Sequence, residues 1–270
     1  MIPIKSERDL RIMRQACAIA ATVLDRLCQE VREGVSTWDI DQAAKKFMAE
    51  YSCRSACYKY RSGGLRYPNY VCISVNDEVI HGIGRPDRVL KRGDIASLDV
   101  CVIYKGFVGD NTRTVAVGEC APETARLIDF TARALEAGIG AAREGNRVGD
   151  ISAAVQEVVE SGGYGIVRDF TGHGVGKGLH EEPPIPNFGR SNTGPLLRAG
   201  MTLAIEPMTT MNPSGDISFG DDGWTVSTPD GKPSCHIEHT VLVRGGGLPA
   251  EILTKPLDWR NGQSVDDIFA

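Results

Sequence analysis

This sequence lacks the features that mark several classes of protein. No segment of its 270 residues approaches the roughly 18 consecutive apolar residues that a membrane-spanning helix needs. Basic residues are not in excess, since 30 Lys and Arg stand against 35 Asp and Glu and the formal net charge is −5. This balance argues against nucleic acid or an anionic membrane as the main partner, because such surfaces are bound through clustered basic side chains.

Cysteine pairs with metal-site spacing are also absent. The eight cysteines are scattered through apolar segments without a CxxC motif, and only Cys53 and Cys57 lie close together. We interpret them as small buried side chains in a reducing compartment, in preference to a disulfide framework or a zinc knot. The start of the chain, MIPIKSERDL, is charged and shows neither a signal-peptide core nor a transit peptide, so the sequence predicts a cytoplasmic protein.

Two long helices are predicted from apolar residues at helical spacing. The first runs from an N-cap at Ser6 to a stop at Gly34, and the second runs from Pro122, a good first-turn residue, to Gly145. Each ends in the tripeptide REG, and each REG leads into a shorter amphipathic helix at an offset of 143 − 32 = 111 residues. This spacing indicates a duplicated helix pair.

Two further segment pairs occur in the same order in both parts of the chain. LKRGDIASLD parallels LRAGMTLAIE, so that strands ending in Asp99 and Glu206 correspond. DNTRTVAVG parallels EHTVLVRG, so that Asp110 and Glu238 both stand at the mouth of a β-branched strand. Two similar α/β halves that face each other across a pseudo-twofold axis would bring these four carboxylates together between them.

Four converging carboxylates need a cation, because they repel one another and buried charge must be compensated. A pair of divalent ions is the economical solution, and an oxygen-rich site with one imidazole suits Mn, Fe(II) or Co(II) better than Zn or Ni. Two such ions can share a hydroxide that attacks an amide bond. In TGHGVGKGLHEEPPIP, His173 can supply the nitrogen ligand and His180 lies near enough to contact substrate.

Strand alternation predicts which side chains share a face. In IASLDVCV, Asp99 and Cys101 point to the same side of the strand. In CHIEHTVLV, His236 shares a face with Glu238, whereas His239 points the other way and is expected outside the site. His236 stays open between two interpretations, because its face matches that of the acid but a lone histidine is more often hydrogen-bonded than a ligand.

Five motifs occur in one order along the chain, namely NDEVIHGIGRP, SLDVCVIYKGFVGDNTRTVAVG, TGHGVGKGLHEEPPIP, LAIEPM and GWTVSTPDGKPSCHIEHTVLV. Together they resemble type I methionine aminopeptidases, in their compact bacterial or organellar form, within the creatinase-like pita-bread superfamily. The resemblance implies an α/β (α+β) pita-bread fold, with two pseudo-twofold-related halves around a central antiparallel sheet backed by helices. It predicts one catalytic domain, 1–253, with halves of about 1–120 and 121–253, and a C-terminal tail, 254–270, without an assigned role.

The resemblance also implies the residues of the site. Its metal ligands fall on Asp99, Asp110, His173, Glu206 and Glu238. His81 is expected to contact the substrate amine or assist proton transfer, His180 to contact the scissile carbonyl, and Glu206 to exchange a proton with the bridging water. The small apolar methionine pocket falls on Cys57, Tyr67, Cys72, Leu179 and Trp224. Leu179 replaces a Phe of some relatives, and the segment 58–70 is longer than in compact relatives.

The activity implied by the resemblance is removal of the initiator methionine from nascent proteins whose second residue is small, by hydroxide attack at a dinuclear metal centre. Peptide N-termini are then the partners, together with a transient ribosome contact, and a monomer without nucleic acid or membrane is expected. Two alternatives stay open. One is a proline-specific peptidase of the aminopeptidase P or prolidase type, although no separate domain precedes the first helix. The other is a metal-free pita-bread binding module, although all five ligand positions are filled.

Overall fold

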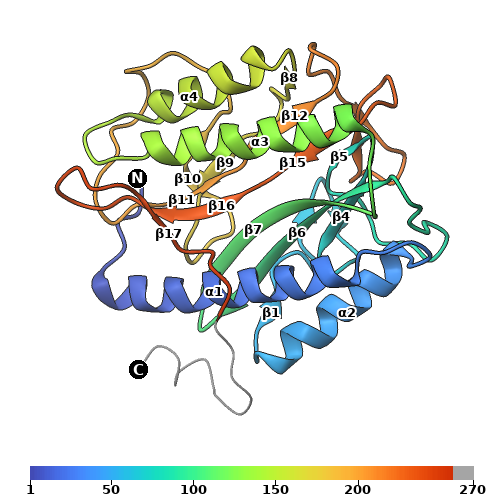
Figure 1. Ribbon diagram of the computed structural model, residues 1–270. Coiled ribbons are helices and arrows are strands. Elements are labelled where there is room, and N and C mark those ends of the chain that lie inside the picture. The colour runs from blue at the N-terminus through green and yellow to red at the C-terminus, as the bar shows by residue number, and fades with distance from the viewer. Residues whose placement is uncertain (258–270) are drawn as a thin grey trace.

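The computed structural model of the protein describes residues 1–257. Within them, two pairs of helices lie on opposite sides of the strands (Figure 1). The pairs are α1 (Glu7–Glu30) with α2 (Thr37–Glu50), and α3 (Pro122–Ala141) with α4 (Val148–Ser161). The duplicated helix pair predicted from the REG repeat is confirmed. No helix in this part of the chain is long and apolar enough to cross a membrane.

Both long helices begin where the sequence predicts. The Ser6 hydroxyl accepts the Asp9 N–H at 3.2 Å while the Asp9 carboxylate accepts the Ser6 N–H, a reciprocal cap for α1. Pro122 opens α3, where its missing N–H costs nothing. Gly138 is tolerated inside α3 because a Cβ there would lie 2.8 Å from a methyl of Val155 on α4, so the glycine allows the two helices to pack closely.

Both long helices end four residues before the predicted glycines, which is a correction. After α1, the Gly34 N–H donates to the Leu90 carbonyl at 2.9 Å; after α3, the Gly145 N–H donates to the Leu197 carbonyl at 3.1 Å. The chain therefore leaves each helix to pair with a distant segment that sequence periodicity does not reveal. The offsets, 145 − 34 = 111 and 197 − 90 = 107, are those of the sequence repeat, so the two halves share this connection.

The central strands form two sheets, one from each half. In the N-terminal half, β6 (Ile95–Tyr104) pairs on one side with β7 (Phe107–Ala116) and on the other with β4 (Cys72–Val75) and β1 (Arg54–Ser55). The C-terminal sheet has the order β10 (Glu181–Ile185), β9 (Gly172–Gly174), β11 (Thr202–Ile205), β16 (His239–Leu242) and β17 (Glu251–Ile252).

Three small sheets complete the described strands. They are β15 (Ser234–His236), β12 (Met208–Thr210) and β8 (Gly165–Ile166); β13 (Ser218–Phe219), β14 (Val226–Ser227) and β5 (Glu78–Ile80); and the hairpin of β2 (Arg61–Ser62) with β3 (Leu65–Arg66). The hairpin lies in the segment 58–70, for which the resemblance predicted extra length.

Strand register fixes how the two halves correspond. Ile95 of β6 pairs with Ala116 of β7, and Thr202 of β11 pairs with Leu242 of β16. Because β6 and β11 correspond at an offset of 202 − 95 = 107, their partners correspond at an offset of 242 − 116 = 126.

This register corrects the predicted match between two of the acids. At an offset of 126, Asp110 corresponds to His236, and Glu238 corresponds to Thr112. The sequence match of Asp110 with Glu238 is therefore wrong by two residues. It followed from an acid that precedes a Thr by two positions in both segments, whereas backbone pairing determines the spatial counterpart.

The acids also lie differently along their strands than predicted. Asp99 lies inside β6 and Asp110 inside β7, because these two strands pair over their whole length. In the C-terminal half, β11 ends at Ile205, one residue before Glu206 as predicted, and pairing resumes between Met208 and His236. Pro207 lies in the gap and has no N–H with which to continue the ladder.

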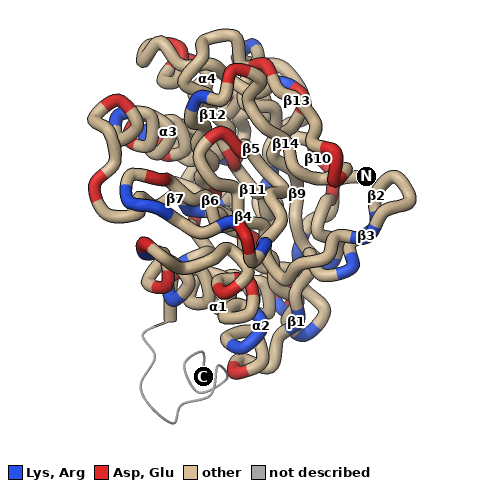
Figure 2. Tube along the Cα trace, turned by 90° about the vertical axis from the view of Figure 1, so that its right-hand side faces the viewer, with Lys and Arg blue, Asp and Glu red and all other residues tan. Residues whose placement is uncertain are grey.

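Each half has its own apolar core beneath its helices. The larger one packs α1 and α2 against the face of β6 that carries Leu98, Val100 and Val102. Acidic and basic residues are interspersed along the outer elements (Figure 2). The predicted tail, 254–270, lies mostly outside the described residues; within them, the Leu257 N–H donates to the Thr22 hydroxyl of α1 at 2.8 Å.

Candidate metal centre and active-site pocket

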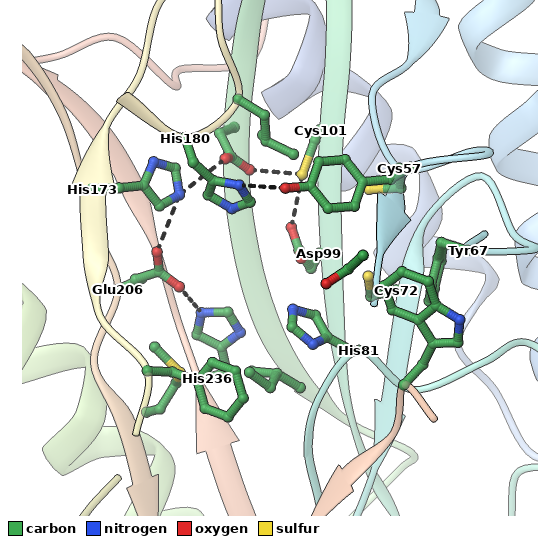
Figure 3. A pocket seen from close by; sticks show the side chains of 18 of the residues that line it. Cys57, Tyr67, Cys72, His81, Asp99, Cys101, His173, His180, Glu206 and His236 are labelled. Atoms are coloured by element: carbon green, nitrogen blue, oxygen red, sulfur yellow. Dashed lines mark hydrogen bonds and ion pairs between the residues drawn. The ribbon is translucent and has the colours of Figure 1, made fainter. Parts of the chain in front are cut away.

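A cavity of about 430 Å³ opens between the two halves. All of the site residues predicted from the sequence line it: Cys57, Tyr67, Cys72, His81, Asp99, Asp110, His173, Leu179, His180, Glu206, Trp224 and Glu238. Figure 3 shows the labelled members gathered around one space, from strands and loops of both halves. Their roles stay predictions, but the spatial convergence on which those roles depend is present.

The four carboxylates reach the pocket from two different kinds of backbone. Asp99 and Asp110 stand on the paired strands β6 and β7, and Glu206 and Glu238 stand where pairing is interrupted in the C-terminal half. The Glu238 N–H donates to the Thr112 carbonyl at 2.9 Å, and its carboxylate accepts the Thr112 hydroxyl at 3.0 Å. These bonds fix the two halves against each other at the site.

Burial raises the pKa of all four acids, and repulsion from neighbouring acids raises the pKa of Asp99, Asp110 and Glu238 further. Burial raises the pKa of Asp99 and of Glu238 well above the ordinary range, and the nearby Asp110 carboxylate raises both further. Burial, followed by the charge of Glu206, raises the pKa of Asp110, and burial raises the pKa of Glu206 to about 8. Such a cluster retains protons at neutral pH unless a cation compensates the charge.

His173 completes the group with a nitrogen. It lies on β9, where its Nδ1 donates to the Gly174 carbonyl at 2.8 Å, so its Nε2 carries a lone pair. That Nε2 lies 3.4 Å from Glu206 Oε1 and 3.7 Å from Asp110 Oδ2. Burial lowers the pKa of His173 to about 4, which keeps the imidazole neutral as a metal ligand requires.

The donor set fits a divalent ion. Asp110, His173 and Glu238 each offer a ligand atom, and these three atoms lie within 4.8 Å of one another. Glu238 Oε1 is buried without a hydrogen-bond partner among the described residues, which is unfavourable unless a ligand satisfies it. One imidazole with several carboxylate oxygens is typical of Mn, Fe(II) and Co(II) sites.

One residue of this centre was recognised only by its strand face. The Cys101 thiol donates to Asp110 Oδ1 at 2.9 Å and lies 3.4 Å from Asp99 Oδ1. A second group with metal-ligand spacing is Asp99, Cys101 and Asp110. Strand alternation predicts that Cys101 points toward the acids, but not that its sulfur lies between them.

His81 and His180 flank the acids. His81 follows β5 with a φ of 59°, a left-handed conformation that residues other than glycine rarely adopt. Its ring lies edge-on to Phe170, with centroids 5.7 Å apart, and burial lowers its pKa to about 4. The His180 ring lies 4.5 Å from that of His173, and its Nδ1 is hydrogen-bonded to the Tyr60 hydroxyl at 3.0 Å. No sequence signal marked Tyr60, whose place depends on the β2–β3 hairpin.

The remaining two histidines separate as their strand faces predict. His236 lines the pocket, and its Nε2 lies 3.2 Å from Glu206 Oε2. His239 is not among the pocket residues and is hydrogen-bonded through Nδ1 to the Thr254 hydroxyl at 2.8 Å, which confirms its expected position outside the site.

An apolar side pocket adjoins the acids. Cys57, Tyr67, Cys72 and Cys101 form a buried cluster against which Leu179 and Trp224 pack. The Tyr67 and Trp224 rings meet edge to face with centroids 5.3 Å apart, and the Tyr67 hydroxyl donates to the Gly82 carbonyl at 2.7 Å. All eight cysteines are free thiols and six are buried, which confirms that they form no disulfide framework.

Comparisons with known proteins agree with this geometry. The model of metallopeptidase family M24 matches residues 11–245. A methionine aminopeptidase of Clostridium acetobutylicum is 44% identical over 94% of this chain and 99% of its own length. The crystal structure of a methionine aminopeptidase from Thermotoga maritima superposes with a TM-score of 0.90 at 40% identity, covering 94% of this chain and all of that one. A prolidase from Pyrococcus horikoshii shares the fold alone, with a TM-score of 0.71 at 22% identity, covering 94% of this chain and 63% of that one.

Proposed function

This chain belongs to the metallopeptidase family M24, and we propose that it hydrolyses the first peptide bond of proteins that begin with methionine. The pita-bread fold expected from the sequence is the fold that it shares with its structural relatives. The observation that carries the proposal is the single pocket in which four carboxylates and His173 from both halves adjoin an apolar side pocket. Similarity to methionine aminopeptidases over nearly the whole chain supports it.

The proposed metal ligands are Asp99, Asp110, His173, Glu206 and Glu238. Four carboxylates carry a charge of −4 when ionised, which two divalent ions balance, and this charge balance supports a dinuclear centre. The oxygen-rich donor set favours Mn, Fe(II) or Co(II). When bound, such ions activate water and polarise the substrate carbonyl.

The protein groups around the ions handle protons and orient the peptide. Glu206, a buried carboxylate whose Oε1 lies 3.4 Å from His173 Nε2, is proposed to accept and return a proton during the reaction. His180 lies against His173 and is hydrogen-bonded to Tyr60, and it is proposed to contact the scissile carbonyl. His81, which lines the same pocket and is neutral at pH 7, is proposed to accept a hydrogen bond from the substrate amine or to assist its proton transfer.

The apolar side pocket is proposed to hold the methionine side chain. Cys57, Tyr67, Cys72, Leu179 and Trp224 supply sulfur and aromatic surfaces, against which an unbranched thioether packs well. Cys72 of this cluster pairs with Asp99 and Cys101 of the cluster contacts Asp110, so a methionine side chain held there would lie next to the proposed metal centre. A small second residue is then the expected preference, since the cavity is shared between the side pocket and the acids.

A proline-specific peptidase and a metal-free binding module are less supported. The prolidase likeness, at 22% identity, concerns the fold alone. The five proposed ligands are all present and converge, whereas a metal-free module has no need of them.

The test is release of methionine from Met-Ala-Ser by protein whose metal content has been verified. We expect free methionine from Met-Ala-Ser and little cleavage of an X-Pro peptide under the same conditions. Absence of free methionine at full metal occupancy would contradict the proposal, and a clear preference for the X-Pro peptide would favour the prolidase alternative.

The cellular setting is proposed from the sequence. Nascent N-termini as substrates and eight free thiols suit the reducing cytoplasm. A monomer with a transient ribosome contact is the proposed working state. Sedimentation at micromolar concentration and co-sedimentation with ribosomes test these two points separately.

A further inference from the structure

His236 is the one histidine of the pocket to which the proposed function gives no role. Its side chain is buried, and only 3% of the residue is exposed. It ends β15 and faces the space that also holds His81, His173 and His180 (Figure 3). A buried polar ring beside a metal centre calls for a physical account, because it could have been replaced by an apolar side chain.

The backbone holds His236 firmly in place. Its N–H donates to the Thr114 hydroxyl of β7 at 3.2 Å, and that hydroxyl donates to the His236 carbonyl at 2.7 Å. His236 also pairs with Met208 of β12, two residues after Glu206. These contacts tie the backbone of His236 to β7, which carries Asp110, and to the strand that follows Glu206, so the fold fixes where the His236 side chain starts.

The pseudo-symmetry places His236 at the position of a proposed ligand. Cys101 pairs with Asp110 in the N-terminal half, and Met208 pairs with His236 in the C-terminal half, at the offsets 208 − 101 = 107 and 236 − 110 = 126. These are the offsets that relate the two strand ladders throughout. His236 is therefore the spatial counterpart of Asp110, and it faces the same centre from the other side.

The carboxylate of Glu206 lies between two imidazoles. His173 Nε2 lies 3.4 Å from its Oε1, and His236 Nε2 lies 3.2 Å from its Oε2. His236 Nε2 is fully buried and has no aligned hydrogen-bond partner among residues 1–257. Glu206 Oε2 lies at hydrogen-bond distance from it, so an imidazole N–H aligned on this oxygen would satisfy both atoms.

We propose that His236 is a positioning residue for Glu206, a neutral imidazole whose Nε2–H donates to Oε2 and thereby directs Oε1 toward His173 and the metal centre. The inference rests on the proposed function for the role of Glu206. A neutral donor suits this place because the four carboxylates already balance two divalent ions, so that a charged group would disturb the balance. Outer partners of this kind orient the ligands of many metal sites.

The experiment compares His236→Leu, which removes the donor, with His236→Gln, whose amide N–H can reach a similar point. His239→Gln is the matched control, because His239 is a half-buried histidine on the opposite strand face and outside the pocket. Each full-length variant is loaded with cobalt. Bound metal is measured by elemental analysis and by the visible absorption of Co(II), and kcat and KM are measured with Met-Ala-Ser.

We expect His236→Leu to retain the cobalt content and the Co(II) spectrum of the wild type and to lose roughly 10–100-fold in kcat with little change in KM. His236→Gln should recover most of kcat, and His239→Gln should match the wild type. Loss of cobalt or a changed spectrum in His236→Leu would make His236 a direct ligand and overturn the proposal. An unchanged kcat, or a glutamine variant as slow as the leucine variant, would overturn it equally.

Two features keep this test independent of folding and of the proposed function. If His236→Leu fails to fold, His236→Gln still decides, because a loss of more than about tenfold in its kcat contradicts a donor role. If the wild type releases no methionine, the proposed function fails. The Co(II) spectra then still show whether His236 is a ligand.

Discussion

The two halves of the molecule share a strand ladder and differ in whether it is continuous. In the N-terminal half, β6 and β7 pair without interruption, and both Asp99 and Asp110 project from paired strands. In the C-terminal half, the ladder is interrupted at Glu206 and Pro207 and resumes at Met208. The imino nitrogen of Pro207 cannot donate, so this stretch of backbone is available for other contacts.

The duplicated strand ladder determines where the site residues lie in each half. The break in the C-terminal ladder determines which contacts those residues make. Because pairing is interrupted opposite Pro207, the Glu238 N–H donates across to Thr112 of the other half. The proposed nitrogen ligand, His173, likewise has no histidine counterpart in the other half. His173 pairs with Ala204 where the N-terminal half pairs Ser74 with Ser97, so the same place in the ladder holds an imidazole in one half and a hydroxyl in the other.

Removing one acid from each half should have the largest effect. We expect Asp110→Ala and Glu238→Ala to lose bound metal and methionine release together, by more than the roughly 10–100-fold that changes around a metal site typically cost. Metal analysis and kcat on the same samples check this. Full turnover at normal metal content in either variant would show that the replaced acid is not a metal ligand.

The histidines that flank the acids should separate metal binding from turnover. His81→Ala, in the N-terminal half, and His180→Ala, in the C-terminal half, should bind metal normally and lose about 10²-fold or more in kcat, because each is proposed to act on the substrate. Steady-state kinetics with metal content measured in parallel checks this. Loss of metal in either variant would place that histidine among the ligands.

Stability of the metal-free protein should fall as the pH rises from about 6.5 to 8. Glu206 has an ordinary pKa of 4.5 and a folded pKa of about 8, so in this window the folded state holds a proton that the unfolded state has released. The contribution of this proton to the free energy of unfolding is complete below pH 4.5. It decreases by about 1 kcal/mol per pH unit as the pH rises to 8. Buried histidines have the opposite effect on stability, which rises with pH as they lose their proton. This effect lies mainly below pH 6.5, because the pKa of His173 is lowered from 6.5 to about 4.

Urea unfolding at several pH values measures this dependence. Glu206→Gln should make it less steep, since three acids with raised pKa values remain, and bound metal should flatten it, because the folded carboxylates are then ionised. A metal-free wild type whose stability is constant or rises over this window would show that the acids are not crowded as described.

The smallest expected effect concerns the caps of the two short helices. The Ser36 hydroxyl accepts the Asp39 N–H at 3.1 Å at the start of α2, whereas Arg147 at the start of α4 offers no such acceptor. Ser36→Ala should cost about 1 kcal/mol of unfolding free energy and Arg147→Ala clearly less. Thermal unfolding of the metal-loaded variants checks this. Equal losses of unfolding free energy in Ser36→Ala and Arg147→Ala would contradict the expected difference between the two caps.

Features that depend on neighbouring residues, such as helix starts, could be predicted from the sequence. Ser6 and Pro122 mark helix starts because capping uses neighbouring residues, but the helix ends depend on Leu90 and Leu197, which lie far along the chain. The four acids were found through the repeat. Their register was not, because an acid followed by Thr occurs at two different ladder positions.

The parts of the site that the sequence did not reveal depend on cross-strand geometry. Cys101 donates to Asp110 across a strand pair, and His236 meets Glu206 only because the ladder resumes after Pro207. Tyr60 reaches His180 from a hairpin whose path no periodicity encodes. The methionine-pocket residues came from the resemblance, since a lone Cys or Trp is more often a core residue.

The central claim is that acids from both halves, with His173, hold divalent metal. Anomalous scattering from crystals of the cobalt-loaded protein tests it most directly. We predict strong peaks inside the pocket, in contact with Asp99, Asp110, His173, Glu206 and Glu238. A pocket without a peak, or metal bound elsewhere by other residues, would contradict the account.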